Sequence, residues 1–242
     1  MDTNALGQPV GGVVVGWVPR AMPGTPVLAG RYCRLERLSP GRHAEELLSA
    51  YEHDVDGSSW TYLSYGPFAD LTSYQQWAEQ ICPALDPFFY AIIDTDPAAG
   101  SVAERAVGVV SYLRIQPDVG SIEVGHVHYS PLLRRRRAAT EAQYLMMRHA
   151  FDDLGYRRYE WKCDALNAAS RAAAERLGFS YEGTFRQAMV VRGRNRDTSW
   201  YSIIDTEWPV VCDRLTTWLA HENFDLQAGQ KTSLYRPEPP RS

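Results

Sequence analysis

The segment from Ile122 to about Gly155 constrains the fold of this chain more than any other part of the sequence. It begins with IEVGHVHYS, whose apolar residues alternate as in a half-buried β-strand, and ends with EAQYLMMRHAFDDLG, whose apolar residues recur at helical spacing. The short basic turn PLLRRRRAAT joins these two parts. A turn between a strand and a helix N-terminus binds anions, because its free backbone amides and the helix dipole both attract negative charge. We therefore expect a pyrophosphate to bind at this turn.

The remainder of the chain predicts further strands and helices around this unit. Apolar runs and alternation predict strands at Tyr32–Leu38, Phe88–Asp94, Ala106–Gln116, Ser121–Tyr129, Arg158–Cys163, Ser180–Arg192 and Arg194–Ile204. Capping residues and periodicity predict helices from Pro40 to His53 after Ser39, from Thr72 or Ser73 to Ile81, from Ala168 to Leu177 after Asn167, and from Pro209 to His221. Hairpins followed by strand–helix–strand crossovers predict an α/β fold, with a mixed, mostly antiparallel, twisted sheet between helices on both faces.

The length of 242 residues fits one large domain or one domain with extensions. Residues 1–30 contain four prolines and six glycines without hydrophobic periodicity, which predicts an extended N-terminal arm. Residues 31–222 are expected to form the single domain, and residues 223–242 a proline-rich C-terminal tail.

Charge and composition argue against several classes of partner. The formal net charge is −4, whereas surfaces that bind nucleic acid are usually basic, so no nucleic-acid partner is expected. No apolar run approaches the roughly 20 residues that span a bilayer, so no membrane segment is expected. The four cysteines lie far apart without a CxxC pair, which favours a reduced, cytoplasmic protein. Whether the protein is a homodimer stays open.

Four short motifs follow one another along the chain in a familiar order. They are EVG at 123–125, ATEA at 139–142, NAAS at 167–170 and LGF at 177–179. This pattern resembles the GNAT superfamily of acetyl-CoA-dependent N-acyltransferases, and most of all the branch that contains the ribosomal-protein N-terminal acetyltransferases. The similarity is dense from about residue 121 to residue 182. The resemblance implies the GNAT fold, acetyl-CoA as the acyl donor and no metal.

The resemblance also implies which residues bind acetyl-CoA. The turn offers amides and arginine side chains to the pyrophosphate, the preceding strand end offers an N–H to the developing oxyanion, and a later helix contacts the pantetheine arm. The residues assigned in this way are Val127, His128, Arg134, Arg135, Arg136, Arg137, Ala138, Ala139, Thr140, Asn167 and Ser170. Arg134 and Ala139 fit the family's phosphate-loop pattern, whereas Arg137 stands where that pattern has a glycine.

Acyl transfer to an amine needs a base, because an alkylammonium has a pKa of about 10.4, and it needs an acid for the leaving thiolate. The resemblance places Glu123 as the base and Ser170 as the acid, with Asn167 capping the same helix and contacting the pantetheine arm. The tyrosine that many members use as the acid is absent, since Ala174 occupies its position. Alternatively, Glu123 pairs with a neighbouring arginine or tyrosine, and Ser170 only satisfies helix backbone groups.

His126 and His128 lie on one face of the predicted strand, as paired metal ligands also do. No third ligand accompanies them at a recognisable spacing, so the sequence predicts no metal site. A base role for either histidine is an alternative to Glu123.

Residues 54–69 form an aromatic, turn-rich segment. Its rings, Trp60, Tyr62, Tyr65 and Phe68, are expected where this family closes the acceptor site, because aromatic rings suit an ammonium group or an apolar chain. Simple packing of the loop is the alternative, since tyrosine and tryptophan are routinely half-buried.

These residues predict an N-acetyltransferase that transfers the acetyl group of acetyl-CoA to a primary amine of a small molecule or peptide, by direct attack in a ternary complex. Three alternatives are an N-terminal acetyltransferase of a protein, as the branch implies, a non-catalytic CoA-binding regulatory module, and an RNA-associated protein that uses the arginine run.

Overall fold

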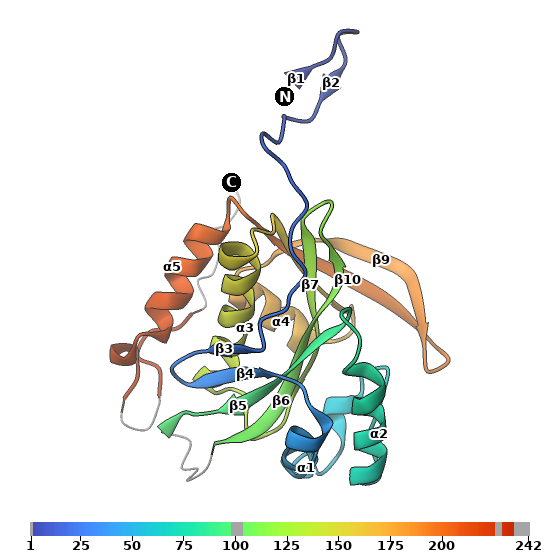
Figure 1. Ribbon diagram of the computed structural model, residues 1–242, viewed down its shortest axis with the longest axis vertical. Coiled ribbons are helices and arrows are strands. Elements are labelled where there is room, and N and C mark those ends of the chain that lie inside the picture. Colours follow the sequence, from blue (N-terminus) through green and yellow to red (C-terminus); the bar gives the residue numbers. More distant parts are fainter. Residues whose placement is uncertain (1, 98–103, 226–228, 235–242) are drawn as a thin grey trace.

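The computed structural model describes residues 2–97, 104–225 and 229–234. Its main element is an eight-stranded sheet with the order β3-β4-β5-β6-β7-β8-β10-β9 (Figure 1). The strands are β3 (Val27–Ala29), β4 (Cys33–Arg37), β5 (Phe88–Asp94), β6 (Arg105–Gln116), β7 (Ser121–Tyr129), β8 (Arg158–Asp164), β9 (Ser180–Val191) and β10 (Arg194–Ile204). Neighbouring strands are antiparallel except for β7 and β8, which are parallel. The predicted mixed α/β fold is therefore confirmed.

Helices cover both faces of this sheet (Figure 1). They are α1 (Pro40–Tyr51), α2 (Leu71–Ile81), α3 (Arg137–Arg148), α4 (Ala168–Leu177) and α5 (Trp208–Leu219). Side chains from α1 and α2 belong to one hydrophobic core, and side chains from α3, α4 and α5 belong to another. Short turns of helix follow at Ser58–Trp60, at His149–Asp153, where α3 continues as a π-helical turn, and at His221–Asn223.

Strand β5 contributes side chains to the hydrophobic cores on both faces of the sheet. Its residues 88, 90 and 92 contribute to the core with α3 to α5, and residues 89, 91 and 93 contribute to the core with α1 and α2. Successive side chains of a strand point to opposite faces, so a strand covered on both sides becomes apolar throughout. The apolar run FFYAII at residues 88–93 is the consequence.

The helix starts agree with the expectations in part. Asn167 caps α4 as expected, because its side chain accepts a hydrogen bond from Ser170 N–H. Ser39 precedes α1, but its side chain makes no capping hydrogen bond. The expectation of a cap at Thr72 or Ser73 was wrong: Asp70 caps α2, and the Ser73 hydroxyl completes a capping box with it.

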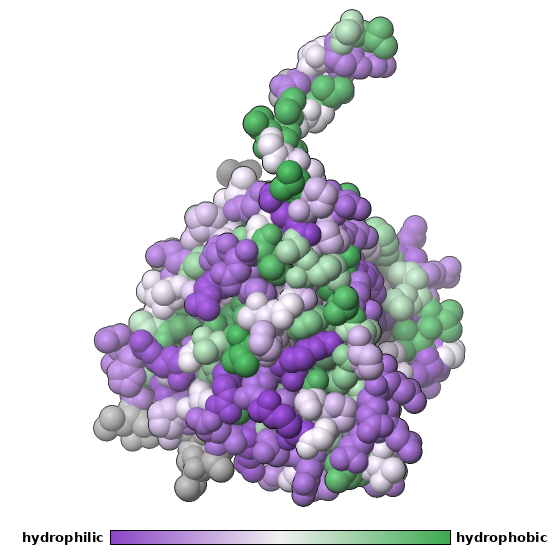
Figure 2. Space-filling view, viewed as in Figure 1, coloured by the Kyte–Doolittle hydropathy of each residue, from purple (hydrophilic) through white to green (hydrophobic). Residues whose placement is uncertain are grey.

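The N-terminal arm starts with a small hairpin of β1 (Asp2–Thr3) and β2 (Pro9–Val10), which projects from the body (Figure 1). Hydrophobic and hydrophilic residues are both exposed along this projection (Figure 2). The arm meets the body at Trp17, whose indole N–H donates to the Asp118 carbonyl at 2.9 Å. Strand β3 lies within residues 1–30 yet pairs with β4, so the end of the predicted arm is part of the sheet.

The expectations of a C-terminal tail and of no membrane segment both involve residues that the structure does not describe. Of the predicted tail at 223–242, the stretches 226–228 and 235–242 lie outside the described residues. Within the described part of the chain, no helix is long and apolar enough to cross a membrane.

Candidate active site

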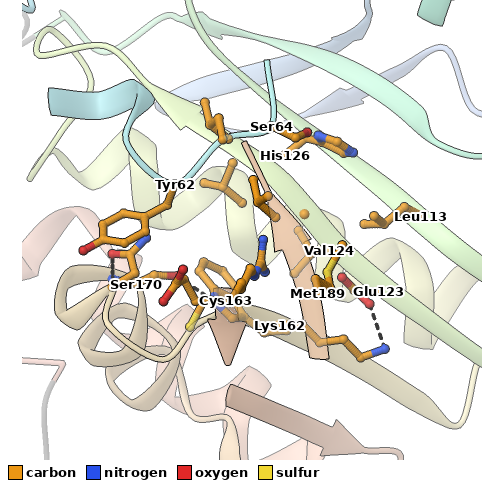
Figure 3. A pocket seen from close by; sticks show the side chains of 18 of the residues that line it. Tyr62, Ser64, Leu113, Glu123, Val124, His126, Lys162, Cys163, Ser170 and Met189 are labelled. Carbon is orange, nitrogen blue, oxygen red and sulfur yellow. Dashed lines mark hydrogen bonds and ion pairs between the residues drawn. The ribbon is translucent and has the colours of Figure 1, made fainter. Parts of the chain in front are cut away.

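A cavity of about 220 Å³ opens where β7 and β8 separate (Figure 3). The parallel pairing of these strands ends at Val124 and Trp161. In the register between β6 and β7, neither His126 nor Val127 has a partner residue, and His126 has a positive φ of 49°. An unpaired extra residue bends a strand and interrupts its ladder, so the end of β7 has backbone groups available to a ligand. The loop at 59–64, the start of α4 and the β9–β10 hairpin complete the cavity wall.

Glu123 lies in this cavity and is buried. Its Oε1 accepts a hydrogen bond from Arg114 Nη1 at 2.5 Å, and its Oε2 lies 2.9 Å from Lys162 Nζ (Figure 3). Burial raises the pKa of this carboxyl above its ordinary value, although Lys162 and Arg114 act in the opposite direction. The carboxylate is therefore ion-paired, as the alternative expectation had it, and it also lies in the cavity, where its role as a base stays a prediction.

Ser170 lines the same cavity from the first turn of α4. Its Oγ accepts a hydrogen bond from Trp161 Nε1–H at 3.0 Å, and its backbone N–H donates to Asn167 Oδ1 at 3.0 Å. An indole N–H can only donate, so the serine hydroxyl retains its own proton for another acceptor. Asn167 also lines the cavity, which brings all three residues predicted as catalytic into one space.

The turn between β7 and α3 has unused backbone amides. Within the described residues, no hydrogen bond uses the amides of Arg135, Arg137 or Ala138 at the start of α3. Arg135 has a positive φ of 62°, the side chains of Arg134 and Arg135 are exposed, and that of Arg136 is half-buried. Free amides at a helix N-terminus beside exposed guanidinium groups form an anion site, so the turn fits the pyrophosphate of CoA.

Several side chains of this turn have partners within the protein, among them Arg134, whose Nε donates to the Tyr129 carbonyl at 3.1 Å, and Arg136, which lies 3.9 Å from the Asp94 carboxylate. Arg137 is buried, donates to the Asp96 carboxylate from Nε at 2.7 Å and from Nη2 at 2.6 Å, and stacks over the Tyr32 ring at 4.1 Å. Thr140 Oγ1 accepts a hydrogen bond from Arg176 Nη2 at 2.9 Å. What Arg137 can offer a ligand is therefore its backbone amide, and not its charge.

A carboxylate fixes the position of α3 against the N-terminal strands. Glu141 accepts hydrogen bonds from the backbone amides of residues 31, 32 and 33 at 2.8, 2.6 and 2.8 Å. Ala139, one turn before this contact, is buried, and its amide donates to the Arg136 carbonyl at 3.2 Å. The start of α3 is thus held rigidly in front of the turn.

The two histidines of β7 differ in their surroundings. His126 lines the cavity, and burial lowers its pKa to about 4. His128 has its Nε2 at 2.9 Å from Ser59 Oγ and its ring stacked on Tyr51 at 4.0 Å, and burial lowers its pKa to about 3. Both rings are therefore neutral near pH 7, and the side chain of His128 belongs to the packing of α1. In the described part of the chain, no cluster of three or more His, Cys, Asp or Glu is arranged to hold a metal.

The four aromatic residues of the loop divide between cavity and core. Tyr62 lines the cavity and donates its hydroxyl to the Leu166 carbonyl at 3.1 Å. Trp60 is buried, and Tyr65 and Phe68 pack with it in the core below α1 and α2. Ring contacts join these three residues, which support the loop and do not line the cavity.

Sequence reasoning missed several residues of the cavity wall: Arg114, Lys162, Cys163, Met189 and Arg196. One signal was present in β8, where the charged residues Arg158, Glu160 and Lys162 alternate with aromatic residues and so predict one polar face. The pairing of Lys162 with Glu123 depends on the register between strands 39 positions apart in the chain, which no local pattern contains.

Comparison with known proteins agrees with this fold and site. Residues 34–180 match the model of the acetyltransferase (GNAT) domain. A GCN5-related N-acetyltransferase from Brucella melitensis is 44% identical, with 90% of this chain and 96% of that chain covered and a TM-score of 0.85. A probable acetyltransferase of the GNAT family from Chromobacterium violaceum is 40% identical, covers 84% of this chain and 98% of that chain, and has a TM-score of 0.75. The chain belongs to the GNAT family of acetyltransferases.

A shorter match points to the expected branch of the family. The "Putative ribosomal N-acetyltransferase YdaF" of Bacillus subtilis is 35% identical over 69 residues, which are 28% of this chain and 38% of that protein. The chain thus matches well under half the length of this relative. A structure of the same fold, the microcin C7 self-immunity acetyltransferase MccE, which is 20% identical over 72% of this chain and 93% of that chain with a TM-score of 0.61, is described in complex with acetyl-CoA and AMP.

Proposed function

We propose that this protein transfers the acetyl group of acetyl-CoA to a primary amine of a small molecule or peptide, by direct attack in a ternary complex. One observation carries the proposal: Glu123 and Ser170, a carboxylate and a hydroxyl that could act as base and acid, line one cavity at the point where β7 and β8 separate. Acyl transfer to an amine needs these two groups on either side of the reacting carbonyl.

Acetyl-CoA supplies the activated acetyl group when it is bound. The amides of Arg135, Arg137 and Ala138 and the side chains of Arg134 to Arg136 would hold its pyrophosphate. The backbone of Val127 and His128 and the Asn167 side chain would hold the arm that leads to the thioester, with an N–H of this strand end facing the oxyanion.

Glu123 is proposed to remove the proton of the acceptor amine, directly or through a water. Burial raises its pKa, which makes the carboxylate a better proton acceptor than an exposed glutamate. Arg114 and Lys162 keep it ionised and hold it in one orientation. A proton taken from the ammonium therefore has a fixed acceptor at the cavity wall.

Ser170 is proposed to give its proton to the departing thiolate. The Trp161 indole holds the serine oxygen as an acceptor, so the hydroxyl hydrogen is the group that turns to the ligand. The backbone bond to Asn167 fixes the same residue at the helix start.

The name of the curated relative favours one second candidate, in which the amine is the N-terminus of a ribosomal protein. Both candidates use the same residues for the chemistry and differ only in what surrounds the amine.

The decisive experiment measures thiol release from acetyl-CoA by the purified protein with a panel of polyamines, amino acids, amino-sugar antibiotics, N-terminal peptides and ribosomal proteins. Turnover with a small amine or peptide supports the proposal, and turnover with intact proteins alone supports the second candidate. A non-catalytic module would bind CoA and release no thiol with any member. Binding is followed separately as a thermal shift, since ligand at a hundred times its Kd adds about 2.7 kcal/mol to the unfolding free energy.

A further inference from the structure

The cavity contains a cation that has no anionic partner in the described structure. Arg196 on β10 lines the cavity, and its Nε is enclosed by the protein without a hydrogen-bond partner. Among the described residues, no ion pair or hydrogen bond involves its guanidinium group. A guanidinium remains charged at every physiological pH, and the side chain of Arg196 is half-buried at the cavity wall.

The acidic groups nearest to Arg196 in the cavity wall are already in use. Glu123 is held by Arg114 and Lys162. Asp164 Oδ1 accepts a hydrogen bond from the Leu166 amide at 2.9 Å. Cys163 is not an anion near neutral pH, because burial raises the pKa of its thiol. No ion pair within the described residues joins these groups to Arg196, so its guanidinium group is available to a ligand in the cavity.

The strand register places this charge on the same face of the sheet as the proposed base. In the pairing of β10 with β8, Trp200 lies opposite Lys162 and Thr198 lies opposite Asp164. Side chains two apart on a strand share a face, so Arg196 follows on the face of Lys162, which contacts Glu123. Met189, the partner of Arg196 on β9, lines the cavity as well. Arg196 and Glu123 therefore both face the cavity in which an acceptor amine would be bound.

We infer that the acceptor carries an anionic group, a carboxylate or a phosphate, next to its amine, and that Arg196 binds this group. The inference rests on the proposed function, because it names the class of amine that the same cavity accepts. Arginine suits both anions, since its planar group donates two parallel hydrogen bonds to a carboxylate or a phosphate. Glu123 would face the amine while Arg196 faces the anion, so the cavity would recognise the acceptor by both charges.

The test compares matched amines that differ only in the anion. One pair is a seryl-aspartyl dipeptide amide and its seryl-asparaginyl counterpart, and the other is phosphoethanolamine and ethanolamine. We expect kcat/KM from thiol release, at equal concentrations of unprotonated amine, to favour the anionic member of at least one pair by about 10- to 100-fold, the effect of one charge-assisted hydrogen bond. Whichever pair shows the preference identifies the anion as carboxylate or phosphate.

Variants then assign the preference to one side chain. Arg196→Gln should abolish the preference, so that within this variant the anionic and neutral members of each pair have equal kcat/KM, and Arg196→Lys should retain part of the preference. Arg194→Gln is the matched control, because Arg194 is an exposed arginine of the same hairpin that does not line the cavity. Thermal melting of each variant establishes that it is folded.

The two proposals fail in different ways. Equal turnover of both members of each pair, or a preference that survives in Arg196→Gln, overturns the inference and leaves the acetyltransferase function in place. Absence of thiol release with every amine overturns the proposed function. In that case calorimetric binding of the anionic members decides on the anion site: binding lost in Arg196→Gln but not in Arg194→Gln supports it, and absence of binding overturns it.

Discussion

The indole Nε1 of Trp161 donates a hydrogen bond to Ser170 Oγ at 3.0 Å, which joins the end of β8 to the first turn of α4. The contact occupies the serine oxygen as an acceptor, so the hydroxyl hydrogen is the part of the group left to donate. Trp161 is also the last residue of β8 that pairs with β7, so the contact lies where these two strands separate. The proposed acid is therefore hydrogen-bonded to the residue at which β7 and β8 separate.

The first prediction separates the acid from its support. Ser170→Ala should lower turnover about a hundredfold at all pH values, the usual contribution of a general acid. Trp161→Phe retains the ring and removes one neutral hydrogen bond, so it should lower turnover only about fivefold. The thermal shift caused by CoA should be unchanged in both variants. Wild-type turnover in Ser170→Ala would remove the acid from this residue.

The second prediction concerns the base. Glu123→Gln should lower kcat about a hundredfold and leave the affinity for acetyl-CoA nearly unchanged, because the carboxylate faces the acceptor. Part of the loss should be recovered at high pH, where a larger fraction of the amine is already unprotonated. The measurement is kcat against pH for the wild type and the variant.

Glu160→Gln is the control for this prediction. Glu160 Oε2 also pairs with Lys162, at 2.7 Å, but Glu160 does not line the cavity. A loss in Glu160→Gln as large as that in Glu123→Gln would mean that the orientation of Lys162, and not proton transfer, explains the effect.

Much of the fold could be predicted because local patterns decide it. The apolar run of β5 and the helix after Asn167 were expected at the residues where they occur. The cap of α2 was missed by two or three residues, since Asp70, Thr72 and Ser73 are all good capping residues and tertiary contacts select among them. The sequence predicts a mixed, mostly antiparallel sheet but not the order of its strands, because strand pairing is decided by contacts between residues far apart in the sequence.

The candidate site likewise contains residues that local motifs predict and residues that only long-range contacts bring in. Glu123, Asn167 and Ser170 belong to short motifs, so the sequence predicts them. Lys162 reaches Glu123 only because β7 and β8 are parallel neighbours, and Arg137 reaches Asp96 across 41 positions. These long-range pairs have no local signature. They explain why the sequence identifies the arginine run but not which arginines remain free for a ligand.

The third prediction distinguishes two arginines of this run. Arg135→Ala should weaken CoA binding, more at low salt than at high salt, because its side chain is exposed and salt screens exposed charges. Its unfolding free energy should be nearly unchanged. Arg137→Ala should instead lower the unfolding free energy by about 3–5 kcal/mol, because it leaves the Asp96 carboxylate buried without this partner.

Calorimetric titration with CoA at two salt concentrations and urea denaturation of both variants check this distinction. Replacing Asp96 by asparagine in Arg137→Ala is the control, since it removes the buried charge and should recover part of the stability. If Arg137→Ala is as stable as the wild type and loses CoA binding in a salt-dependent way, its guanidinium contacts phosphate and the assignment made here is wrong.

The last prediction concerns pH and stability. Burial lowers the pKa of His128 to about 3, whereas an unfolded histidine has a pKa of about 6.5. Between these values the unfolded chain binds a proton that the folded protein does not, so the unfolding free energy must fall as the pH decreases below 6.5. Stability from this neutral ring is therefore fully present above pH ~6.5, and it is lost towards pH 3 by up to about 1.4 kcal/mol per pH unit.

His128→Gln tests this origin of the acid sensitivity. The variant should be less stable than the wild type at pH 7, since it loses the stacking on Tyr51, but its unfolding free energy should decrease less steeply between pH 6.5 and 4.5. Urea denaturation at several pH values gives both slopes. His53→Gln is the control, because the side chain of His53 is exposed and should leave the slope unchanged. Equal slopes in His128→Gln and the wild type would show that this ring becomes protonated within the fold, and that its burial does not determine the acid sensitivity.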